Sequence, residues 1–237
     1  MLMFLNYLMI IKMLKLFEHT PICLIETPFK EKFGVPRQPM LISEALGIME
    51  FPKNDFFMEA FRGIDGFSHL WLIFSFHEVI QEGYKALVRP PRFSGKEKWG
   101  VFATRSPHRP NHLGLSVVKF KSIDYGHDKI TLIVEGVDLV SGTPIFDIKP
   151  YIGYADAYPE ALSGPFQYRP EFKSVKWKVE AEMNEATKII IEKVIGLDPR
   201  PSLDQTDTFG VSVAGFNVRF KFVEDHFEIL EVTKEQF

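Results

Sequence analysis

Short runs of apolar residues, separated by proline and glycine, dominate the first two thirds of the chain. The fourth and fifth runs flank the turn sequence YGHD, which predicts a β-hairpin. Many short strands with glycine and proline between them are typical of a β-barrel or a closed mixed sheet. Six runs have the length of a strand, at residues 22–26, 45–51, 67–77, 113–123, 129–137 and 144–148.

Helical spacing of apolar residues occurs twice. Residues 55–64 have apolar side chains three or four positions apart, with Asn54 or Asp55 as the N-cap. In the last third, Ser174 is a candidate cap for a helix that continues to about Ile195, where Gly196 ends it. Its apolar positions are Trp177, Met183, Ala186, Ile190 and Val194. A small antiparallel sheet is then predicted at residues 210–214, 216–222 and 227–232.

A segment rich in proline, glycine and aromatic residues at 158–170 divides the chain into two parts. The patterns predict a mainly β protein, with a β-barrel domain at residues 20–160 and a small α+β domain at 161–237. Residues 1–19 form an apolar extension without a basic start or a small-residue cleavage site. The extension is shorter than the roughly 20 apolar residues that span a bilayer, so we expect no membrane association. Met13 is an alternative start.

Composition narrows the class of protein. The chain has 237 residues, of which 46% are hydrophobic and 23 are phenylalanine, enough for a sizeable core. Cys23 is the single cysteine, which excludes a disulfide framework and a cysteine-rich metal site. We expect Cys23 to be a small buried apolar residue. One cysteine also fits a reducing compartment, and the cytoplasm is therefore the expected location.

Positive charge is concentrated in one segment. Residues 83–123 contain nine lysines and arginines against one acid, Glu97, a net charge of +8. The rest of the chain then carries −11, because the whole has a net charge of −3. Such segregation favours a polyanionic partner such as nucleic acid over an ordinary solvated face, which mixes both signs.

Inside this segment lies the part of the chain richest in candidate chemistry, GVFATRSPHRPNHLGLSVVKF at residues 100–120. Pro107 and Pro110 exclude a helix or an interior strand between the two apolar ends. Arginine, serine, threonine and asparagine side chains are thus placed on a stiff loop between two strands. Polar residues on a loop with a rigid scaffold are a common way to build a binding site.

Five separated motifs carry a resemblance to a known family. In this sequence they read PFKEKFGVPRQP (28–39), GFSHLWLIFSFHE (66–78), RSPHRPNHLGLS (105–116), DLVSGTPIFDIKPYIGYADA (138–157) and the weaker LDPRPS (197–202). Together they resemble the TsaA-type, TrmO-like family of tRNA methyltransferases. The resemblance implies a TsaA-like β-barrel, a homodimer, and methyl transfer from S-adenosyl-L-methionine to N6 of a threonylcarbamoyladenosine-type nucleotide beside the anticodon of tRNA.

The resemblance also implies a set of cofactor-binding residues. An arginine can pair with the methionine carboxylate, a glutamate can face the amine or a ribose hydroxyl, and a glycine allows close backbone approach. The family usually has aspartate where this chain has Ser141, which leaves a side-chain contact there open. The residues that match are Pro36, Arg37, Gln38, His77, Glu78, Arg105, Leu115, Ser141, Gly142, Thr143 and Pro144.

Catalysis and tRNA binding complete the expected site. Methylation of the exocyclic nitrogen requires a proton acceptor, for which Asp147 is the candidate, with Tyr151 as a stacking platform for the base. Asp147 can equally form a structural ion pair with Lys149 or with an arginine of the loop. Candidate tRNA contacts are Arg92, Lys96, Arg109 and Arg200; for Arg200, a structural pair with Asp198 is as plausible.

Two other classes of function were weighed. His69, His77, His108 and His112 cluster in the sequence, which would suit a metal hydrolase. Pro110 lies between the last two and makes a helical metal pair improbable, so we expect no metal. A non-catalytic RNA-binding module would use the basic segment equally well, but it leaves the residues 36–38 and the turn at Gly142 unexplained.

Overall fold

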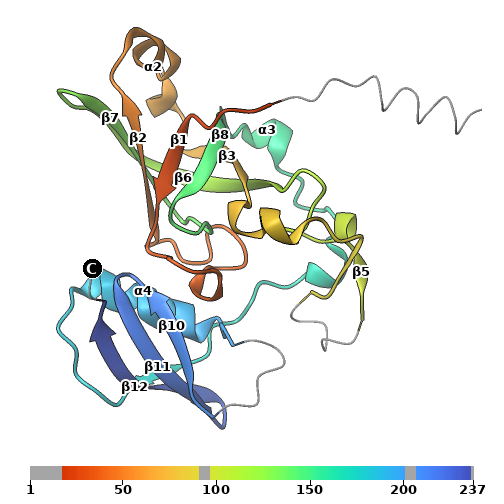
Figure 1. Cartoon of the computed structure of the whole chain (residues 1–237), viewed down its shortest axis with the longest axis vertical. Helices are drawn as coiled ribbons and strands as arrows, with labels where there is room; N and C mark the ends of the chain where they lie inside the picture. The colour runs from red at the N-terminus through yellow and green to blue at the C-terminus, as the bar shows by residue number, and fades with distance from the viewer. Residues whose placement is uncertain (1–17, 91–96, 201–206, 236–237) are drawn as a thin grey trace, which may run out of the picture.

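The computed structural model describes residues 18–90, 97–200 and 207–235. Its first part is a closed barrel in which every neighbouring pair of strands is antiparallel, in the order β1-β2-β7-β6-β3-β8 (Figure 1). This confirms the prediction of a mainly β fold with a barrel. The strands are β1 (Cys23–Glu26), β2 (Leu46–Pro52), β3 (His69–Ser75), β6 (Leu113–Tyr125), β7 (Lys129–Glu135) and β8 (Thr143–Pro150).

The alternation that predicted the strands also fills the barrel. Ile130, Leu132 and Val134 of β7 are fully buried, and Met49 and Phe51 of β2 lie opposite them in the same core. Burying one such side chain contributes about 1.5–3 kcal/mol. The closed sheet is therefore a rigid support for the loops at its ends.

Short helices connect the strands. Helix α2 (Asp55–Ala60) begins as predicted, because the Asn54 side chain accepts a hydrogen bond of 3.0 Å from the Phe57 N–H. It ends at Ala60, and a 3-10 turn, η2 (Ile64–Gly66), follows. The other connecting elements are η1 (Lys32–Gly34), η3 (His77–Glu82), β4 (Leu87–Val88), β5 (Trp99–Gly100), η4 (Val101–Ala103), α3 (Gly153–Asp156) and η5 (Gly164–Phe166).

The C-terminal part is a four-stranded sheet in the order β10-β11-β12-β9. Strands β10 (Phe209–Val213), β11 (Phe216–Val223) and β12 (His226–Lys234) form the predicted antiparallel sheet. Strand β9 (Val175–Trp177) pairs in parallel with β12, so the expected helix from Ser174 is wrong. Val175 and Trp177 of β9 pack against the core from an extended backbone, and Val179 packs there from the bend that follows. The helix is α4 (Glu185–Gly196), capped by Asn184.

Loop residues 27–44 of the barrel contact the C-terminal part, which lies below the barrel in Figure 1. The Ala214 N–H donates to the Pro28 carbonyl over 2.7 Å, and the Ser212 N–H donates to Glu31 over 2.9 Å. An ion pair of 2.6 Å joins Lys193 of α4 to Glu44. These contacts fix the loop that contributes to the site described below.

Two further expectations concern the apolar N-terminal extension and Cys23. Residues 1–17 of the apolar extension lie outside the described part of the chain. Within that described part, every helix is too short or too polar to cross a membrane. Cys23 is half-buried on β1, and desolvation raises the pKa of its thiol to about 12.

Candidate functional site

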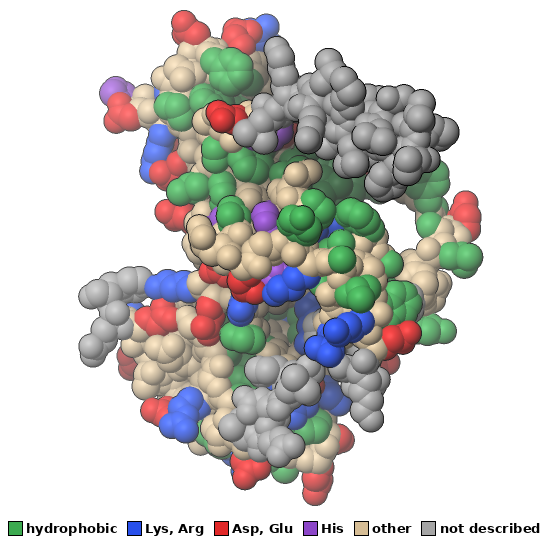
Figure 2. All heavy atoms as spheres, turned by 45° about the vertical axis from the view of Figure 1, so that its right-hand side comes forward, with side chains coloured by type: hydrophobic (Ala, Val, Ile, Leu, Met, Phe, Trp, Pro, Cys, Tyr) green, Lys and Arg blue, Asp and Glu red, His purple; other side chains and the backbone are tan. Residues whose placement is uncertain are grey.

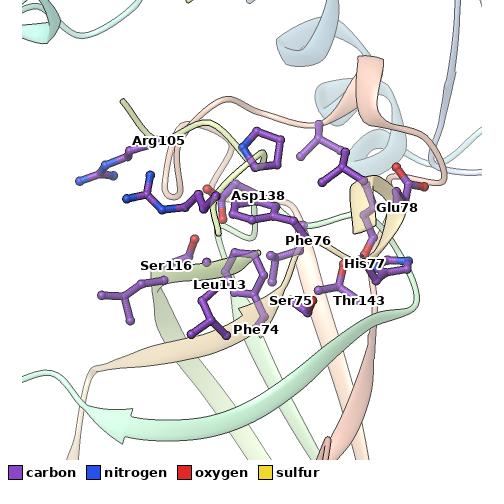
Figure 3. A pocket seen from close by; sticks show the side chains of 18 of the residues that line it. Phe74, Ser75, Phe76, His77, Glu78, Arg105, Leu113, Ser116, Asp138 and Thr143 are labelled. Atoms are coloured by element: carbon purple, nitrogen blue, oxygen red, sulfur yellow. Dashed lines mark hydrogen bonds between the residues drawn. The ribbon is translucent and has the colours of Figure 1, made fainter. Parts of the chain in front are cut away.

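A cavity of about 650 Å³ opens at one end of the barrel. Four loops and the ends of two strands form it: residues 32–38, the end of β3 with η3, the loop 104–109 with the start of β6, and residues 138–143. Figure 3 shows Asp138, Ser116, Phe76 and His77 around this common space, although they come from distant parts of the sequence. The barrel therefore brings four of the five sequence motifs together.

Eight of the eleven expected cofactor residues line the cavity: Pro36, Arg37, Gln38, His77, Glu78, Arg105, Leu115 and Thr143. Of the other three, Ser141 and Gly142 belong to the turn before β8, and Pro144 lies in that strand. The Ser141 hydroxyl accepts a hydrogen bond from the Thr27 N–H over 3.2 Å, and Gly142 has a φ of 83°, which favours glycine. These residues hold the turn that places Thr143 in the cavity wall.

The two arginines of the central loop have different environments. Arg109 is half-buried and donates to the backbone carbonyls of Thr104, over 2.8 Å, and Val101, over 3.3 Å. Arg105 is exposed, and its guanidinium donates to the Gln38 side-chain oxygen across the cavity mouth. Arg109 thus braces the loop, whereas Arg105 reaches toward the expected cofactor residues.

Asp138 adds an acid that the sequence did not single out. Its Oδ1 atom is buried without a hydrogen-bond partner among the described residues. Burial raises the pKa of this carboxyl to about 6, against the opposing effects of hydrogen bonds from Ser116 and its own backbone N–H and of the Arg105 charge. The signal in the sequence was a single aspartate between the apolar residues Val137 and Leu139.

The expected catalytic residues lie outside the cavity lining. Asp147 is exposed on β8, where its Oδ1 accepts from the Ile148 N–H and its Oδ2 lies 3.7 Å from the Lys149 ammonium. This is the structural arrangement that the sequence left open. The Tyr151 ring lies beside Trp71, with centroids 5.9 Å apart, and Trp71 does line the cavity.

Trp71 is held in place by a hydrogen bond from its indole ring. Its indole N–H donates to the Asp156 carboxylate over 3.0 Å, and the same oxygen accepts from the Ile152 N–H over 2.8 Å. These two hydrogen bonds, the backbone one first, lower the pKa of Asp156 below its usual range. Nothing in the sequence marks this role, because Trp71 stands in an aromatic run that predicts a buried strand.

Only some of the basic residues expected to contact RNA lie in the described part of the chain. Lys and Arg side chains gather across the middle of the face shown in Figure 2. Arg92 and Lys96 lie outside the described residues. Of the others, Lys85 pairs with Glu82, while Lys119 and Lys121 both pair with Glu135.

Arg200 occupies a structural position in the C-terminal part. Its guanidinium donates twice to the Asp198 carboxylate, over 2.6 and 2.8 Å, and lies 4.3 Å from the centre of the Phe222 ring. It also lines a second cavity of about 450 Å³ between α4 and the loop 32–41. Lys32 and Arg37 line both cavities, which therefore adjoin.

The histidines do not form a cluster. His112 contacts the Pro107 carbonyl, His108 faces Lys85 and Glu82, and His69 contacts Ser68. In the described ranges, no three His, Cys, Asp or Glu side chains are placed to hold a metal ion. The hydrolase alternative receives no support from this arrangement.

Comparison with known proteins gives two family matches. The model of the tRNA-methyltransferase O N-terminal domain matches residues 24–157, and that of the TrmO C-terminal domain matches residues 166–235. The chain is 38% identical over 228 residues to the tRNA (adenine(37)-N6)-methyltransferase of Escherichia coli, which covers 90% of this chain and 96% of that protein. It is 41% identical over 160 residues to the enzyme of the same name from Eikenella corrodens, covering 65% and 90%.

Solved structures agree with these matches. A crystal structure of TrmO from Pseudomonas aeruginosa superposes with a TM-score of 0.74 and 32% sequence identity, covering 94% of this chain and 99% of that one. A protein of the same organism with the name "Putative S-adenosylmethionine-dependent methyltransferase RcsF" is 35% identical over 226 residues, covering 90% of this chain and 96% of that protein. With both family models matched in order along a barrel of this topology, the chain belongs to the TrmO family of tRNA methyltransferases.

Proposed function

We propose that this protein transfers a methyl group from S-adenosyl-L-methionine to N6 of the adenosine next to the anticodon of tRNA. The observation that carries the proposal is the convergence of four sequence motifs on one cavity at the end of the barrel. The names of the relatives in Escherichia coli and Eikenella corrodens state this reaction. The fold itself is not evidence for chemistry, because sites rather than folds determine function.

The cavity suits a ligand of mixed character such as S-adenosyl-L-methionine. Its volume of about 650 Å³ lies within the usual range of roughly 300–1,000 Å³ for ligand pockets. Arg37 and Arg105 offer positive charge for a carboxylate, and Glu78 offers negative charge for an ammonium group. Leu113 and Leu115, exposed by 39% and 53%, offer apolar surface for an adenine ring.

When bound, the cofactor supplies an electrophilic methyl group on a sulfonium. The residues of the chain must then bind both substrates, orient the acceptor nitrogen toward the methyl group and exclude water from it. An adenosine in a folded tRNA must leave its stack to enter a pocket, and aromatic side chains commonly receive such a base. Trp71 in the cavity wall and Tyr151 behind it form an aromatic edge suited to that role.

We further propose that the acceptor carries a threonylcarbamoyl group. This modification ends in a carboxylate, which would require a cation beside the reaction site. Lys32 and Arg37 line both the main cavity and the adjoining cavity of about 450 Å³. An amino-acid group attached to N6 could extend from the first cavity into the second and meet these cations.

A homodimer in the cytoplasm completes the proposal. Large apolar side chains are strongly exposed in the segment of the sequence that joins β8 to β9, with Tyr154 exposed by 92%, Leu162 by 93% and Tyr168 by 89%. Exposed apolar surface of this kind marks interaction sites. The single cysteine fits a reducing compartment.

Methylation of defined tRNAs tests the reaction. Purified protein and S-adenosyl-L-methionine are incubated with an unmodified transcript and with the same tRNA carrying threonylcarbamoyladenosine, and the nucleosides are analysed by mass spectrometry. We expect a mass gain of one methyl group only on the modified adenosine. Methylation of both tRNAs would retain the enzyme and reject the substrate class. Tight tRNA binding without methylation of either would favour the RNA-binding module.

A further inference from the structure

Asp138 is held firmly at the wall of the main cavity. Its neighbours Val137 and Leu139 are 1% and 2% exposed, so both side chains anchor in the core. The Val137 N–H donates to the Ala45 carbonyl over 3.3 Å, and the Leu139 carbonyl accepts from the Thr27 hydroxyl over 2.8 Å. The backbone on both sides is thus fixed, and the carboxyl is preorganised on the cavity side (Figure 3).

The Asp138 carboxyl is not fully satisfied by the protein. Its Oδ1 atom is buried, and the described residues give it no hydrogen bond. Buried polar atoms are rarely left in this state, and a bound water or ion, backbone strain or a catalytic role explains those that are. The Ser116 hydroxyl and the Arg105 charge act on the carboxyl from β6 and from the loop before it. A donor from a bound molecule would complete the set.

The reaction proposed above requires a proton acceptor, and the cavity lining offers the imidazole of His77 and two carboxyls, Glu78 and Asp138. Asp147 lies outside the lining and contacts Lys149 instead. Glu78 lines the cavity but is exposed at its mouth. Asp138 is the remaining carboxyl of the lining, and it comes from a rigid segment between β7 and β8.

We infer that Asp138 is the proton acceptor in methyl transfer, an assignment that rests on the proposed function. The acceptor nitrogen gains a bond to the methyl carbon as the carbon–sulfur bond breaks. The positive charge of the sulfonium is lost, and the proton of the nitrogen passes to the Asp138 carboxylate. A neutral thioether, a methylated base and a protonated Asp138 result, and the proton then passes to solvent.

The acidity of the group supports this role. Burial raises the pKa of the Asp138 carboxyl to about 6. A general base is most effective when its pKa lies near the working pH, because it is then both ionised and basic. Below about pH 6 the group is protonated and cannot accept, so turnover should fall. The other charged or titratable groups of the cavity are Lys32, Arg37, His77, Glu78, Arg105 and Arg109.

Replacement of Asp138 by asparagine, with Asp147→Asn as the matched control, tests the inference. Both changes keep the shape of the side chain and remove its charge. We expect Asp138→Asn to lower single-turnover methylation about 10²–10⁴-fold, as for loss of a general base. The dissociation constants for the demethylated cofactor and for tRNA should stay within about threefold. Asp147→Asn should react at the wild-type rate.

Two further measurements do not depend on the rate of the Asp138→Asn variant. In the ligand-free protein, carboxyl ¹³C chemical shifts should show a group that titrates near pH 6 and disappears in Asp138→Asn. Ser116→Ala removes a hydrogen bond that lowers the pKa, so the acidic limb of the pH–rate profile should move to higher pH.

The outcomes separate the assignment from the function. If Asp138→Asn methylates tRNA at the wild-type rate, the acceptor assignment is wrong while the proposed function stands. A loss confined to cofactor binding would show that Asp138 is a binding group and would likewise overturn the assignment. If the wild-type protein methylates no tRNA, the proposed function itself fails.

Discussion

Asp138, the buried acid proposed as the proton acceptor, also lowers the stability of the folded protein when it is ionised. Because the folded pKa of Asp138, about 6, exceeds the ordinary value of 3.8, the protonated form is the one favoured by folding. The stability it contributes is fully present below about pH 4 and is lost as the pH rises past about 6. At about 1.4 kcal/mol for each pH unit of difference, the loss is at most about 3 kcal/mol.

Asp138→Asn should therefore change how stability depends on pH. The asparagine cannot ionise, so the stability of the variant relative to wild type should increase as the pH rises from 4 to 7. Urea unfolding at each pH measures this difference. Parallel curves for the two proteins over that range would contradict a raised pKa at Asp138.

Arg200 gives a second prediction at the scale of one residue. Its two hydrogen bonds to Asp198 and its position over Phe222 hold the segment after α4 against the sheet. Arg200→Ala should destabilise the protein by about 1–3 kcal/mol, since it removes a bidentate charged pair and a cation–π contact. Thermal unfolding checks this result.

Arg219→Ala is the matched control for Arg200→Ala. Arg219 lies in the same sheet, is 62% exposed and pairs with Glu231 over a longer distance of 3.4 Å. An exposed pair of this kind contributes about 0–1 kcal/mol. If Arg200→Ala left the melting temperature unchanged and weakened only tRNA binding, the arginine would be an RNA contact instead.

At the scale of the element, the Phe74 ring of β3 lies close to the backbone of β6 in the cavity lining. Gly114 of β6 pairs with Phe74 of β3, and a Cβ atom at Gly114 would lie 2.3 Å from the Phe74 ring. Gly114→Ala should therefore destabilise the barrel by about 1–3 kcal/mol, as overpacking of a core does. Chemical denaturation measures the change.

Gly66→Ala is the control for Gly114→Ala. A Cβ atom at Gly66 would meet no atom within 4 Å, and the residue lies in the same barrel domain. Its replacement should alter stability by less than about 0.5 kcal/mol. Equal effects of the two substitutions would show that the Phe74 ring can move aside.

The elements that periodicity predicted well are those with one clear buried face. The barrel strands alternate strictly, as at Ile130, Leu132 and Val134, and the hairpin of β6 and β7 has an unambiguous turn. The expected helix from Ser174 was wrong because Trp177, Met183 and Ala186 fit a helical spacing by chance. Val175, Trp177 and Val179 also alternate, and the parallel partner β12 decides for the strand.

The site was predictable only where motifs marked it. The expected residues from 36–38, 77–78 and the central loop do line one cavity. Asp147 was chosen for its sequence context, but its position on β8 places it outside that lining. Closure of the barrel determines which face of a strand an acid near a turn occupies, and it also determines the inward position of Asp138. Both positions depend on tertiary structure, which the local sequence pattern does not contain.

At the scale of the whole molecule, some basic residues form contacts within the protein and others are available to bind RNA. Lys85, Lys119 and Lys121 have acidic partners, and Arg109 binds backbone carbonyls. We therefore assign the tRNA contacts of the segment mainly to its remaining basic residues other than Arg105, which we keep for the cofactor. Arg109→Ala should loosen the loop and reduce both cofactor and tRNA affinity, rather than tRNA affinity alone.

Salt dependence distinguishes RNA contacts from structural charges. Binding of tRNA through phosphates releases counterions, so affinity should fall with salt by a slope of roughly 0.7–0.9 for each neutralised phosphate on a log–log scale. Replacing Arg92 and Lys96 together by alanine should reduce this slope by about one to two units and leave cofactor affinity unchanged. Fluorescence anisotropy with labelled tRNA at several salt concentrations gives the slope. Lys53→Ala, which removes one surface cation where the double variant removes two, is the control, because Lys53 binds the Gly126 carbonyl at the β6–β7 turn, away from the cavity. An unchanged slope in the double variant, or an equal reduction in Lys53→Ala, would place the RNA surface elsewhere on the protein.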